Sequence, residues 1–299
     1  MIVYPAAQKV LVTGANGLLG RKVVEAWRSV CDIHAVVRNM PQQPVEGVTY
    51  IEMDLARPMD VSRLPAKIDT VIHLAQSPHM REFPARGLDI YSVNTASTAQ
   101  LLDWAHRADA SHFLFASTGG VYRPSSTPFH ENSPLEPPRG PLGFYFDTKL
   151  CSETLVRAYE TLMHTVILRP FFIYGPGQAE MMLMPRLINN VRETQAIQLQ
   201  GGQGTFLNPI MVDDAVSALA VSMDDGAPSV FNLAGPEVLS IREIALHIGS
   251  LVGREPVFDI MEGEPPSVVA DITLLEKQLN QPMTSCRDGL EVTINGGAS

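Results

Sequence analysis

The stretch KVLVTGANGLLGRKVVEAW, residues 9–27, constrains the fold more than any other part of the chain. It reads as a short apolar strand, a glycine turn and a helix, with Gly14, Gly17 and Gly20 spaced by three residues. Glycines at this spacing let the backbone turn sharply, let amides approach a pyrophosphate and let the helix pack against the strand, while the helix N-terminus adds partial positive charge. Because the triplet follows a strand and opens a helix, we predict a dinucleotide phosphate site rather than a purely structural turn.

The first 170 residues alternate short apolar runs with longer helical patterns, which is the rhythm of a parallel sheet covered by helices. The runs are rich in Val, Ile and Leu, as is typical of strands buried on both faces. The predicted strands are 9–13, 33–37, 48–53, 70–75, 112–117 and 165–170, and the predicted helices include 88–107 and 145–163. The pattern therefore predicts an α/β fold with a doubly wound parallel sheet.

After residue 170 this rhythm breaks into turns and a mixed set of elements. Helices are predicted near 181–193, 212–223 and 240–252, and a strand at 230–234. This part predicts a smaller, mixed second lobe. Residues 124–143 are rich in proline and glycine and predict a long loop, a kind of segment that is usually functional or mobile.

Charge and composition exclude several classes of protein. The 299-residue chain has a formal net charge of −10 and no basic run, which argues against nucleic-acid binding. No stretch approaches the ~18 apolar residues of a membrane span, and the N-terminus lacks the features of a signal peptide. The three cysteines, Cys31, Cys151 and Cys286, are far apart and in no metal or redox spacing. We therefore expect free thiols, a cytoplasmic location, no metal ion, and no nucleic-acid or membrane partner.

The segment FYFDTKL, residues 144–150, places Tyr145 and Lys149 four positions apart, so a helix would bring the phenol and the ammonium side by side. A nearby positive charge favours the phenolate, and moving a tyrosine pKa from about 10 towards 7 takes roughly 4 kcal/mol. The pair could therefore make a general base. On these residues alone, an ordinary surface helix start is the alternative.

Several motifs together resemble the extended short-chain dehydrogenase/reductase superfamily, in its NAD-dependent epimerase/dehydratase branch. They are TGANGLLG (13–20), HLA (73–75), STGGVY (117–122), YFDTK (145–149), RPFFIYGPG (169–177), NPIMVDDAVSAL (208–219) and FNLAGPEVLSIREIA (231–245). The resemblance covers nearly the whole chain. It implies a dinucleotide-binding Rossmann domain over 1–172, with a contribution from about 208–236, and a mainly substrate-binding lobe over 173–299. It also implies an NAD(P)-dependent oxidoreductase that transfers hydride at a hydroxyl or carbonyl carbon of a sugar-like small molecule, and a homodimer.

The resemblance also assigns roles to individual residues. Tyr145 would be the catalytic acid/base, and Lys149 its activator and a ligand of the nicotinamide ribose. Thr118 matches the family's Ser/Thr position, whose hydroxyl binds the reacting oxygen, and Ser117 is the neighbouring alternative. The other expected cofactor-binding residues are Gly14, Asn16, Gly17, Leu18, Leu19, Gly20, Arg38, Asp54, Leu55, Leu74, Ala75 and Pro170. The expected substrate-binding residues are Gln76, His79, Gly119, Gly120 and Phe172.

The expected cofactor is NADP, with NAD as the alternative. Proteins that prefer NAD usually place an Asp or Glu at the end of the second strand to bind the ribose hydroxyls, whereas Arg38 stands there and suits a 2′-phosphate. If Arg38 is only a solvated cation, NAD would bind through backbone contacts. Asp54 could accept a hydrogen bond from the adenine amino group, or be a solvated loop acid.

The chain departs from the family in two places. Dehydratases of this branch carry acidic residues directly after the catalytic Ser/Thr, where this chain has Gly119 and Gly120, so epimerisation or ketone reduction is favoured over dehydration. The arginines that usually hold a diphosphate are missing from GGQGTFLNPIMVDD and MEGEPPSVVAD, which leaves a nucleotide-linked substrate open. Arg186 or Arg192 could substitute for them.

Two other functions stay open from the sequence. One is a catalytically inactive dinucleotide sensor or scaffold, and the other is an NADPH-dependent reductase of a non-sugar ketone. The roles of two polar residues also stay open. His73 is either a packed core histidine or a catalyst, and Asn94 either supports the active-site loop or is a satisfied helix residue.

Overall fold

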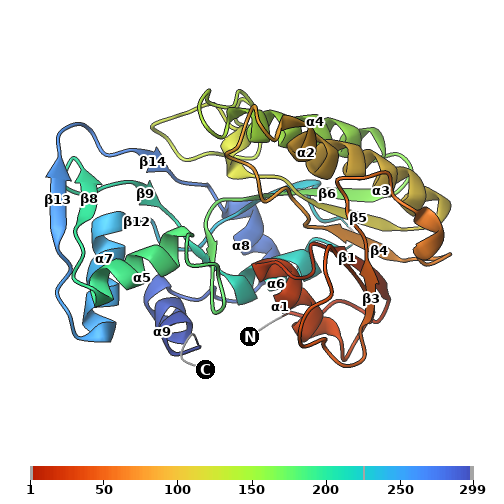
Figure 1. Cartoon of the computed structure of the whole chain (residues 1–299), viewed down its shortest axis with the longest axis horizontal. Coiled ribbons are helices and arrows are strands. Elements are labelled where there is room, and N and C mark those ends of the chain that lie inside the picture. The colour runs from red at the N-terminus through yellow and green to blue at the C-terminus, as the bar shows by residue number, and fades with distance from the viewer. Residues whose placement is uncertain (1–2, 225, 297–299) are drawn as a thin grey trace. The chain divides into compact units, whose positions relative to one another are not determined.

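The computed structural model describes residues 3–224 and 226–296, and Figure 1 traces the chain through them. The chain divides into two compact units, each assembled from several segments. Unit 1 comprises Met1–Pro124, Asn132–Pro170 and Val216–Phe231, and unit 2 comprises Ser125–Glu131, Phe171–Ala215 and Asn232–Ser299. The expected division did not foresee that Ser125–Glu131, in the proline-rich loop, groups with unit 2.

Unit 1 is built on a seven-stranded sheet with the strand order β11-β6-β5-β4-β1-β2-β3. The strands are β1 (Lys9–Thr13), β2 (Asp32–Val37), β3 (Thr49–Glu52), β4 (Thr70–His73), β5 (His112–Ala116), β6 (His164–Pro170) and β11 (Val230–Leu233). The chain order reverses between β1 and β4, and open α/β sheets bind ligands at such a point, beyond the carboxyl ends of the strands. The predicted doubly wound parallel sheet is confirmed, and each predicted strand lies within two residues of its observed bounds.

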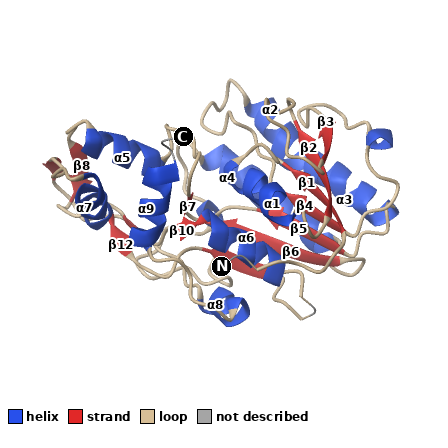
Figure 2. Cartoon of the chain, turned by 90° about the horizontal axis from the view of Figure 1, so that it is seen from below, coloured by secondary structure: helices blue, strands red, loops and turns tan. Residues whose placement is uncertain are grey.

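Helices cover both faces of this sheet (Figures 1 and 2). Helix α1 (Leu18–Trp27) lies on one face, and α2 (Gly87–Tyr91), α3 (Ser97–Arg107) and α4 (Gly143–Ala158) lie on the other. Helix α4 begins two residues before the predicted helix and ends five residues before it. The structure thus places the helix that carries Tyr145 and Lys149 directly against the sheet.

The predicted helix 88–107 is continuous but contains a π-helical turn, Ser92–Ala96, between α2 and α3. The Asn94 carbonyl in this turn accepts hydrogen bonds from the Thr98 hydroxyl at 2.6 Å and from the Ser152 hydroxyl of α4 at 2.8 Å. Side-chain donors that take a helix carbonyl release it from the regular backbone ladder. Such turns are frequent at functional sites.

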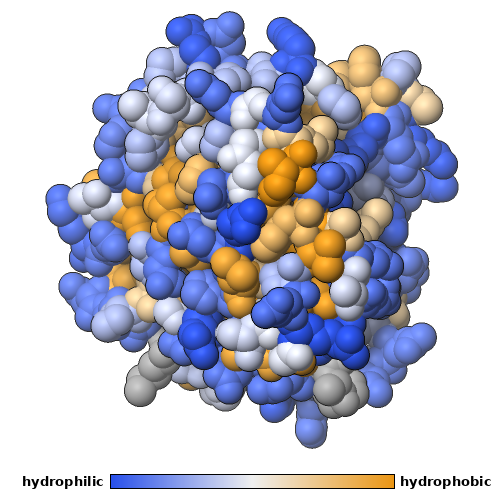
Figure 3. Space-filling view, turned by 90° about the vertical axis from the view of Figure 1, so that its left-hand side faces the viewer, coloured by the Kyte–Doolittle hydropathy of each residue, from blue (hydrophilic) through white to orange (hydrophobic). Residues whose placement is uncertain are grey.

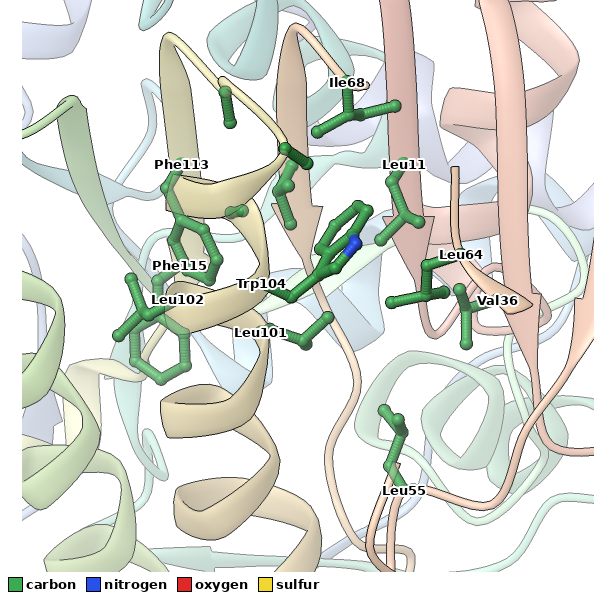
Figure 4. Packing of buried hydrophobic residues seen from close by; sticks show 14 of the residues in the cluster. Leu11, Val36, Leu55, Leu64, Ile68, Leu101, Leu102, Trp104, Phe113 and Phe115 are labelled. Atoms are coloured by element: carbon green, nitrogen blue, oxygen red, sulfur yellow. The ribbon is translucent and has the colours of Figure 1, made fainter. Parts of the chain in front are cut away.

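One hydrophobic core cluster of unit 1 lies between the sheet and the helices α2–α4. Figure 4 shows Leu101 and Trp104 of α3 near side chains that come from the strands, including Leu11 and Phe113. Burial of one such side chain contributes roughly 1.5–3 kcal/mol relative to leaving it in water. This packing holds the strands in register, so the residues that follow their carboxyl ends have fixed positions.

Within the residues that the structure describes, unit 2 contains short strands and five helices or parts of helices. Its strands are β7 (Ile173–Tyr174), β8 (Ile197–Gln200), β9 (Phe206–Leu207), β10 (Ile210–Met211), β12 (Leu239–Ser240), β13 (Phe258–Met261) and β14 (Ser267–Val268). Its helices are α5 (Leu183–Arg192), the start of α6 (Val212–Val221), α7 (Ile241–Val252), α8 (Thr273–Leu279) and α9 (Cys286–Gly296). The strands form three small sheets, β10-β7, β12-β9-β14 and β13-β8.

Helix α7 shows how local sequence fixes one element of unit 2. Ser240 and Glu243 form a reciprocal capping box at its start, and Gly253 ends it in the left-handed conformation at φ 69°. Apolar side chains of unit 2 are also exposed, among them Leu246 of α7 and Ile260 and Met261 of β13. These elements lie on the left of Figure 1, the side that faces the viewer in Figure 3, where apolar and hydrophilic residues are interspersed.

No helix within the described residues is both long and apolar enough to cross a membrane.

Candidate functional site

The glycine turn has the geometry that its spacing predicts. Gly14 has φ 68°, and a Cβ there would lie 2.8 Å from the Ala75 backbone nitrogen, just after β4. A Cβ on Gly20 would lie 2.3 Å from the Gly14 oxygen, so only glycine lets α1 approach the turn this closely. Gly17 is the N-cap of α1, and no side chain caps that helix. The first-turn amides therefore fit an anionic phosphate group.

The rest of the expected cofactor set lies around the same sheet edge. The Asn16 amide donates to the Asn39 carbonyl at 2.8 Å, which ties the glycine turn to the end of β2, beside the exposed Arg38. Leu18 and Leu19 open α1 and are half-buried.

Asp54 follows β3 and makes local contacts. One of its carboxylate oxygens accepts from the Ala56 amide at 3.0 Å, and the other lies 3.4 Å from Arg57 Nε. Leu55 beside it is buried. These contacts fit the alternative of a loop acid. Asp54 is also half-buried at the edge of the sheet where the strands have their carboxyl ends, so a hydrogen bond from the adenine amino group to Asp54 stays a prediction.

His73 ends β4 and is fully buried. Because the Thr98 hydroxyl donates to the Asn94 carbonyl, it accepts from His73 Nε2 at 3.0 Å. His73 Nδ1 then accepts from the Thr13 hydroxyl at 2.6 Å. Burial, and next the charge of Lys149, lower the pKa of His73 to about 3. His73 is therefore a neutral, doubly bonded core residue, and both ring nitrogens are occupied.

The Tyr145–Lys149 pair lies on the buried face of α4, near the end of β5. Tyr145 is 6% exposed, and its phenol donates to the Gln76 amide oxygen at 2.8 Å. Lys149 is 1% exposed and donates to the Ala116 carbonyl at 2.8 Å. Its ammonium also lies 5.0 Å from the centre of the Phe115 ring. The alternative of an ordinary surface cation is therefore wrong.

Burial dominates the titration of both groups. It raises the pKa of the Tyr145 phenol well above its usual value, and the hydrogen bond with the Thr118 side chain opposes this effect. It also lowers the pKa of Lys149 to about 7, while the charge of Glu153 acts in the opposite direction. The pKa of Tyr145 therefore shifts in the direction opposite to the predicted fall. A strongly shifted pair of this kind at a sheet edge is nevertheless typical of catalytic sites.

Thr118 and Ser117 have different surroundings. Thr118 is the N-cap of a 3₁₀ turn (Gly119–Val121), and its hydroxyl accepts from the Gly120 amide at 3.2 Å. The Ser117 hydroxyl instead donates to the buried Glu153 carboxylate at 2.5 Å. The contact with Tyr145 supports Thr118 as the residue that faces the reacting atoms.

Asn94 connects the site to the loop after β4. Its amide oxygen accepts from the Ser77 backbone amide at 2.9 Å, and its nitrogen donates to the Thr148 hydroxyl at 3.0 Å. Thr148 lies between Tyr145 and Lys149 in α4. Asn94 therefore supports the loop, one of its two predicted alternatives, and its hydrogen bonds are also satisfied.

The expected substrate-binding residues of unit 1 make local contacts of different kinds. Gln76 is exposed and contacts Tyr145, while His79 is half-buried and pairs with Glu82 at 2.8 Å. A Cβ on Gly120 would lie 2.1 Å from Phe146 Cε1, and Gly119 beside it is buried.

The chain leaves unit 1 at the end of β6. Pro170 is the last residue of that strand, and Leu74 and Ala75 follow β4 in the same sheet. Phe172 belongs to unit 2, where its carbonyl accepts from the Ile210 amide at 3.0 Å.

One buried feature was missed by the sequence reasoning. Glu153 of α4 and Arg169 of β6 form a fully buried ion pair directly behind Lys149. A charged residue inside an otherwise apolar strand was the available signal, because such residues are almost never buried without a partner. Within the described residues, no group of three His, Cys, Asp or Glu side chains could hold a metal ion.

Known proteins with similar sequences and structures agree on the family. Residues 10–234 match the NAD dependent epimerase/dehydratase family. A Bacillus subtilis protein named as an uncharacterized UDP-glucose epimerase is 28% identical, over 94% of this chain and 95% of its own length. A Streptomyces bikiniensis dTDP-4-dehydro-6-deoxy-D-allose reductase is 26% identical, over 96% of this chain and 95% of its own length. The crystal structure of UDP-glucuronic acid 4-epimerase from Bacillus cereus in complex with UDP-glucuronic acid and NAD has a TM-score of 0.83 and 26% identity, covering 96% of this chain and 98% of that one. By its glycine turn, its tyrosine–lysine pair and these matches, the chain belongs to the NAD-dependent epimerase/dehydratase family, within the extended short-chain dehydrogenases/reductases.

Proposed function

We propose that this enzyme transfers hydride reversibly at a hydroxyl or carbonyl carbon of a nucleotide-linked sugar, as an epimerase or a ketone reductase. The observation that carries the proposal is the Tyr145 phenol, which lies at the sheet edge with Gln76 and Thr118 as hydrogen-bonding partners. When bound, the nicotinamide dinucleotide accepts or supplies the hydride.

The side chains divide the remaining work. Tyr145 takes the proton of the substrate hydroxyl during oxidation and returns a proton to the oxygen during reduction. The Thr118 hydroxyl orients that oxygen. The Gln76 amide oxygen accepts the hydrogen bond of the Tyr145 phenol until the substrate oxygen takes its place. Lys149, held by the Ala116 carbonyl, provides a cation behind the phenol when it is protonated. Gly14, Gly17 and Gly20 bring backbone amides to the pyrophosphate.

Dehydration is disfavoured because the site lacks the acids that would move protons at neighbouring carbons. Gly119 and Gly120 occupy the positions after Thr118, and the Phe146 ring fills the space next to Gly120. A larger residue at position 120 would have to displace that ring. Tyr145 is the acid/base that we assign to this site, and one such group is sufficient for epimerisation or reduction.

The proposal of a nucleotide-linked substrate is supported by the similar proteins, and not by arginines at the positions that usually bind the diphosphate. The two curated relatives reported above are named for UDP- and dTDP-linked sugars. In this chain the arginines on α5, Arg186 and Arg192, are exposed and are the candidate substitutes for the missing clamp.

A substrate panel tests the proposal and separates the two reactions. The purified enzyme is incubated with UDP- and dTDP-linked hexoses, and with their 4-keto forms or free non-sugar ketones plus NADPH. Reduction consumes the reduced dinucleotide in proportion to product, whereas epimerisation changes the sugar stereochemistry, followed by NMR, without net consumption. Turnover of free ketones alone would favour a non-sugar reductase, and dinucleotide binding without any turnover would favour the sensor.

We propose NADP(H) as the preferred dinucleotide. Arg38 directly follows β2, and Asn16 of the glycine turn reaches the carbonyl of the next residue, so Arg38 lies at the edge where the adenosine ribose is expected. A guanidinium there can bind a 2′-phosphate, which a carboxylate would repel. The structural neighbour from Bacillus cereus was crystallised with NAD, so this preference would set the two enzymes apart.

NADP(H) is expected to bind at least about tenfold more tightly than NAD(H), or ~1.4 kcal/mol, and Arg38→Asp should reverse the order. Calorimetric titration of both dinucleotides measures this. Arg63→Asp, which makes the same charge change on another exposed arginine, should leave the ratio of the two affinities unchanged. Equal affinities in the wild type, or a preference that Arg38→Asp does not alter, would contradict the proposal.

We also propose a cytoplasmic homodimer. The supporting observations are three free cysteines and the apolar side chains that α2 leaves exposed beside α4, Leu88 at 78% and Tyr91 at 48%. Sedimentation equilibrium should give twice the 32.7 kDa mass of one chain, and Leu88→Glu should lower it towards that mass. A single-chain mass for the wild type at micromolar concentration would refute the dimer.

A further inference from the structure

A buried network of four side chains lies behind the Tyr145–Lys149 pair. The Glu153 carboxylate accepts from Arg169 Nε at 3.0 Å and from Arg169 Nη2 at 2.7 Å. It also accepts from the Ser117 hydroxyl at 2.5 Å. Arg169 Nη1 donates to the Tyr122 phenol at 2.8 Å, with the guanidinium 4.8 Å from the centre of that ring. All four side chains are buried.

The network fixes the direction of the Thr118 hydroxyl. The Ser117 amide donates to the Leu168 carbonyl at 2.7 Å, and its side chain is held by Glu153, so this residue is restrained at both ends. Thr118 has extended backbone angles, φ −161° and ψ 148°. Successive side chains of an extended backbone point to opposite sides. With Ser117 turned towards Glu153, Thr118 is turned towards Tyr145.

The same carboxylate lies one helical turn after Lys149, on the same buried face of α4. Asp147 is nearer to Lys149 in sequence, but its side chain is 40% exposed and pairs with Arg139 at 2.9 Å. The other ionisable groups near Lys149 are Tyr145 on its own helix, His73 from β4 and, beyond Glu153, Arg169 from β6. His73 is neutral, and Arg169 is a cation. Arg157 also approaches Glu153, at 3.9 Å, but its side chain is 43% exposed. Glu153 is therefore the group that favours the charged form of the buried lysine.

We propose that Glu153 is a positioning residue of the active site: it orients Thr118 through Ser117, and it holds Lys149 in its cationic form, without touching substrate or dinucleotide. The inference rests on the proposed function, because it assigns Glu153 its effect through Thr118 and Lys149. It predicts two separable effects, one on geometry and one on charge.

Glu153→Gln removes the charge while it keeps the shape of the side chain. Catalysis needs Lys149 protonated, so the alkaline limb of the kcat/KM profile should move to lower pH by about one unit or more. At pH 8, kcat should fall about tenfold or more, while the KM of the sugar substrate changes little.

Ser117→Ala is the second variant, and it removes only the link to Thr118. It should lower kcat several-fold and leave the alkaline limb where it is in the wild type. Thr70→Val is the matched control, because the Thr70 hydroxyl is equally buried and donates to Gln8 at 2.7 Å, but at the opposite end of β4. It should change neither kcat nor the pH profile.

A readout without catalysis separates this inference from the proposed function. Lys149→Met removes the titrating group, so the difference in unfolding free energy between Lys149→Met and its parent depends on pH. Burial lowers the pKa of Lys149 to about 7, so the folded state binds fewer protons than the unfolded one between pH 7 and about 10.5. The wild type should therefore gain stability relative to Lys149→Met as pH rises through this window. In the Glu153→Gln background the lower end of the window should move to lower pH.

The outcomes are distinct. The inference would be overturned if Glu153→Gln changed neither the alkaline limb of the kcat/KM profile nor the pH range in which Lys149 affects the unfolding free energy. If Tyr145→Phe were inactive in the same experiments, the proposed function would still stand. Full turnover by Tyr145→Phe would overturn the proposed function itself, whereas a shifted stability window would still support the effect of Glu153 on Lys149. If Glu153→Gln does not fold, wild-type kcat in Ser117→Ala would overturn the positioning effect.

Discussion

Replacing Tyr145 by phenylalanine is expected to lower kcat by roughly 10²- to 10⁴-fold, the usual contribution of a positioned general acid or base. Phenylalanine fills the same buried space on α4 but can neither take nor return a proton. Gln76, which accepts the phenol proton at 2.8 Å, is exposed, so water can replace its lost partner and the fold should be preserved. Steady-state kinetics with the best substrate of the panel measures the loss.

Binding of the dinucleotide should survive this substitution, because the glycine turn and Lys149 are intact. Calorimetric titration is expected to give the wild-type affinity within about threefold, or ~0.7 kcal/mol. Tyr50→Phe serves as the control, since it also removes one phenol hydrogen bond, from the Val45 amide at 3.2 Å, at β3. That variant should keep full activity. Turnover by Tyr145→Phe within tenfold of the wild type would remove Tyr145 from the reaction.

Much of unit 1 could be predicted because its signals are local. A buried parallel strand is a run of Val, Ile and Leu, and β1 follows its predicted bounds, 9–13. The glycine turn could also be predicted in detail, since each glycine meets a local steric requirement. These are a positive φ at Gly14, the helix start at Gly17 and close helix packing at Gly20. Only a few residue types meet these requirements, and so the pattern can be recognised in the sequence.

Most of the strands of unit 2 could not be predicted, because they depend on pairing between distant segments. Strand β8 pairs with β13, with Ile197 opposite Phe258, across about sixty residues of chain. Five other strands of this unit have only two residues each, which is too short for any hydrophobic period to appear. The π-helical turn was missed for the same reason, because the Ser152 hydroxyl that takes the Asn94 carbonyl comes from another helix.

The candidate site shows the same division between local and long-range effects. The spacing of Tyr145 and Lys149 correctly places them on one helix face. Their titration was misjudged, since the sequence suggests that a cation lowers the tyrosine pKa, whereas burial raises it and also lowers the pKa of Lys149 to about 7. Desolvation depends on what packs around a group, and spacing within one segment does not contain that information. The contact between Gln76 and Tyr145 is likewise set by the fold.

The largest expected effect on stability comes from breaking the buried ion pair at the Arg169 end. Arg169→Met should lower the free energy of unfolding by about 3–5 kcal/mol, because it leaves the buried Glu153 carboxylate without its bidentate partner. Both tryptophans, Trp27 and Trp104, are buried in unit 1. Urea unfolding followed by tryptophan fluorescence therefore reports on the unit that contains the ion pair.

Arg157→Met is the matched control, since it removes another arginine from the same carboxylate. Arg157 lies 3.9 Å from Glu153 and its side chain is 43% exposed, so water already screens the interaction and the cost should stay below about 1 kcal/mol. The double variant Arg169→Met/Glu153→Leu should recover part of the loss, because it removes the unpaired charge, although Ser117 and Tyr122 lose partners. Equal costs for the two single arginine variants would mean that burial does not decide the strength of this pair. A double variant less stable than Arg169→Met would mean that the unpaired carboxylate is not the source of the loss.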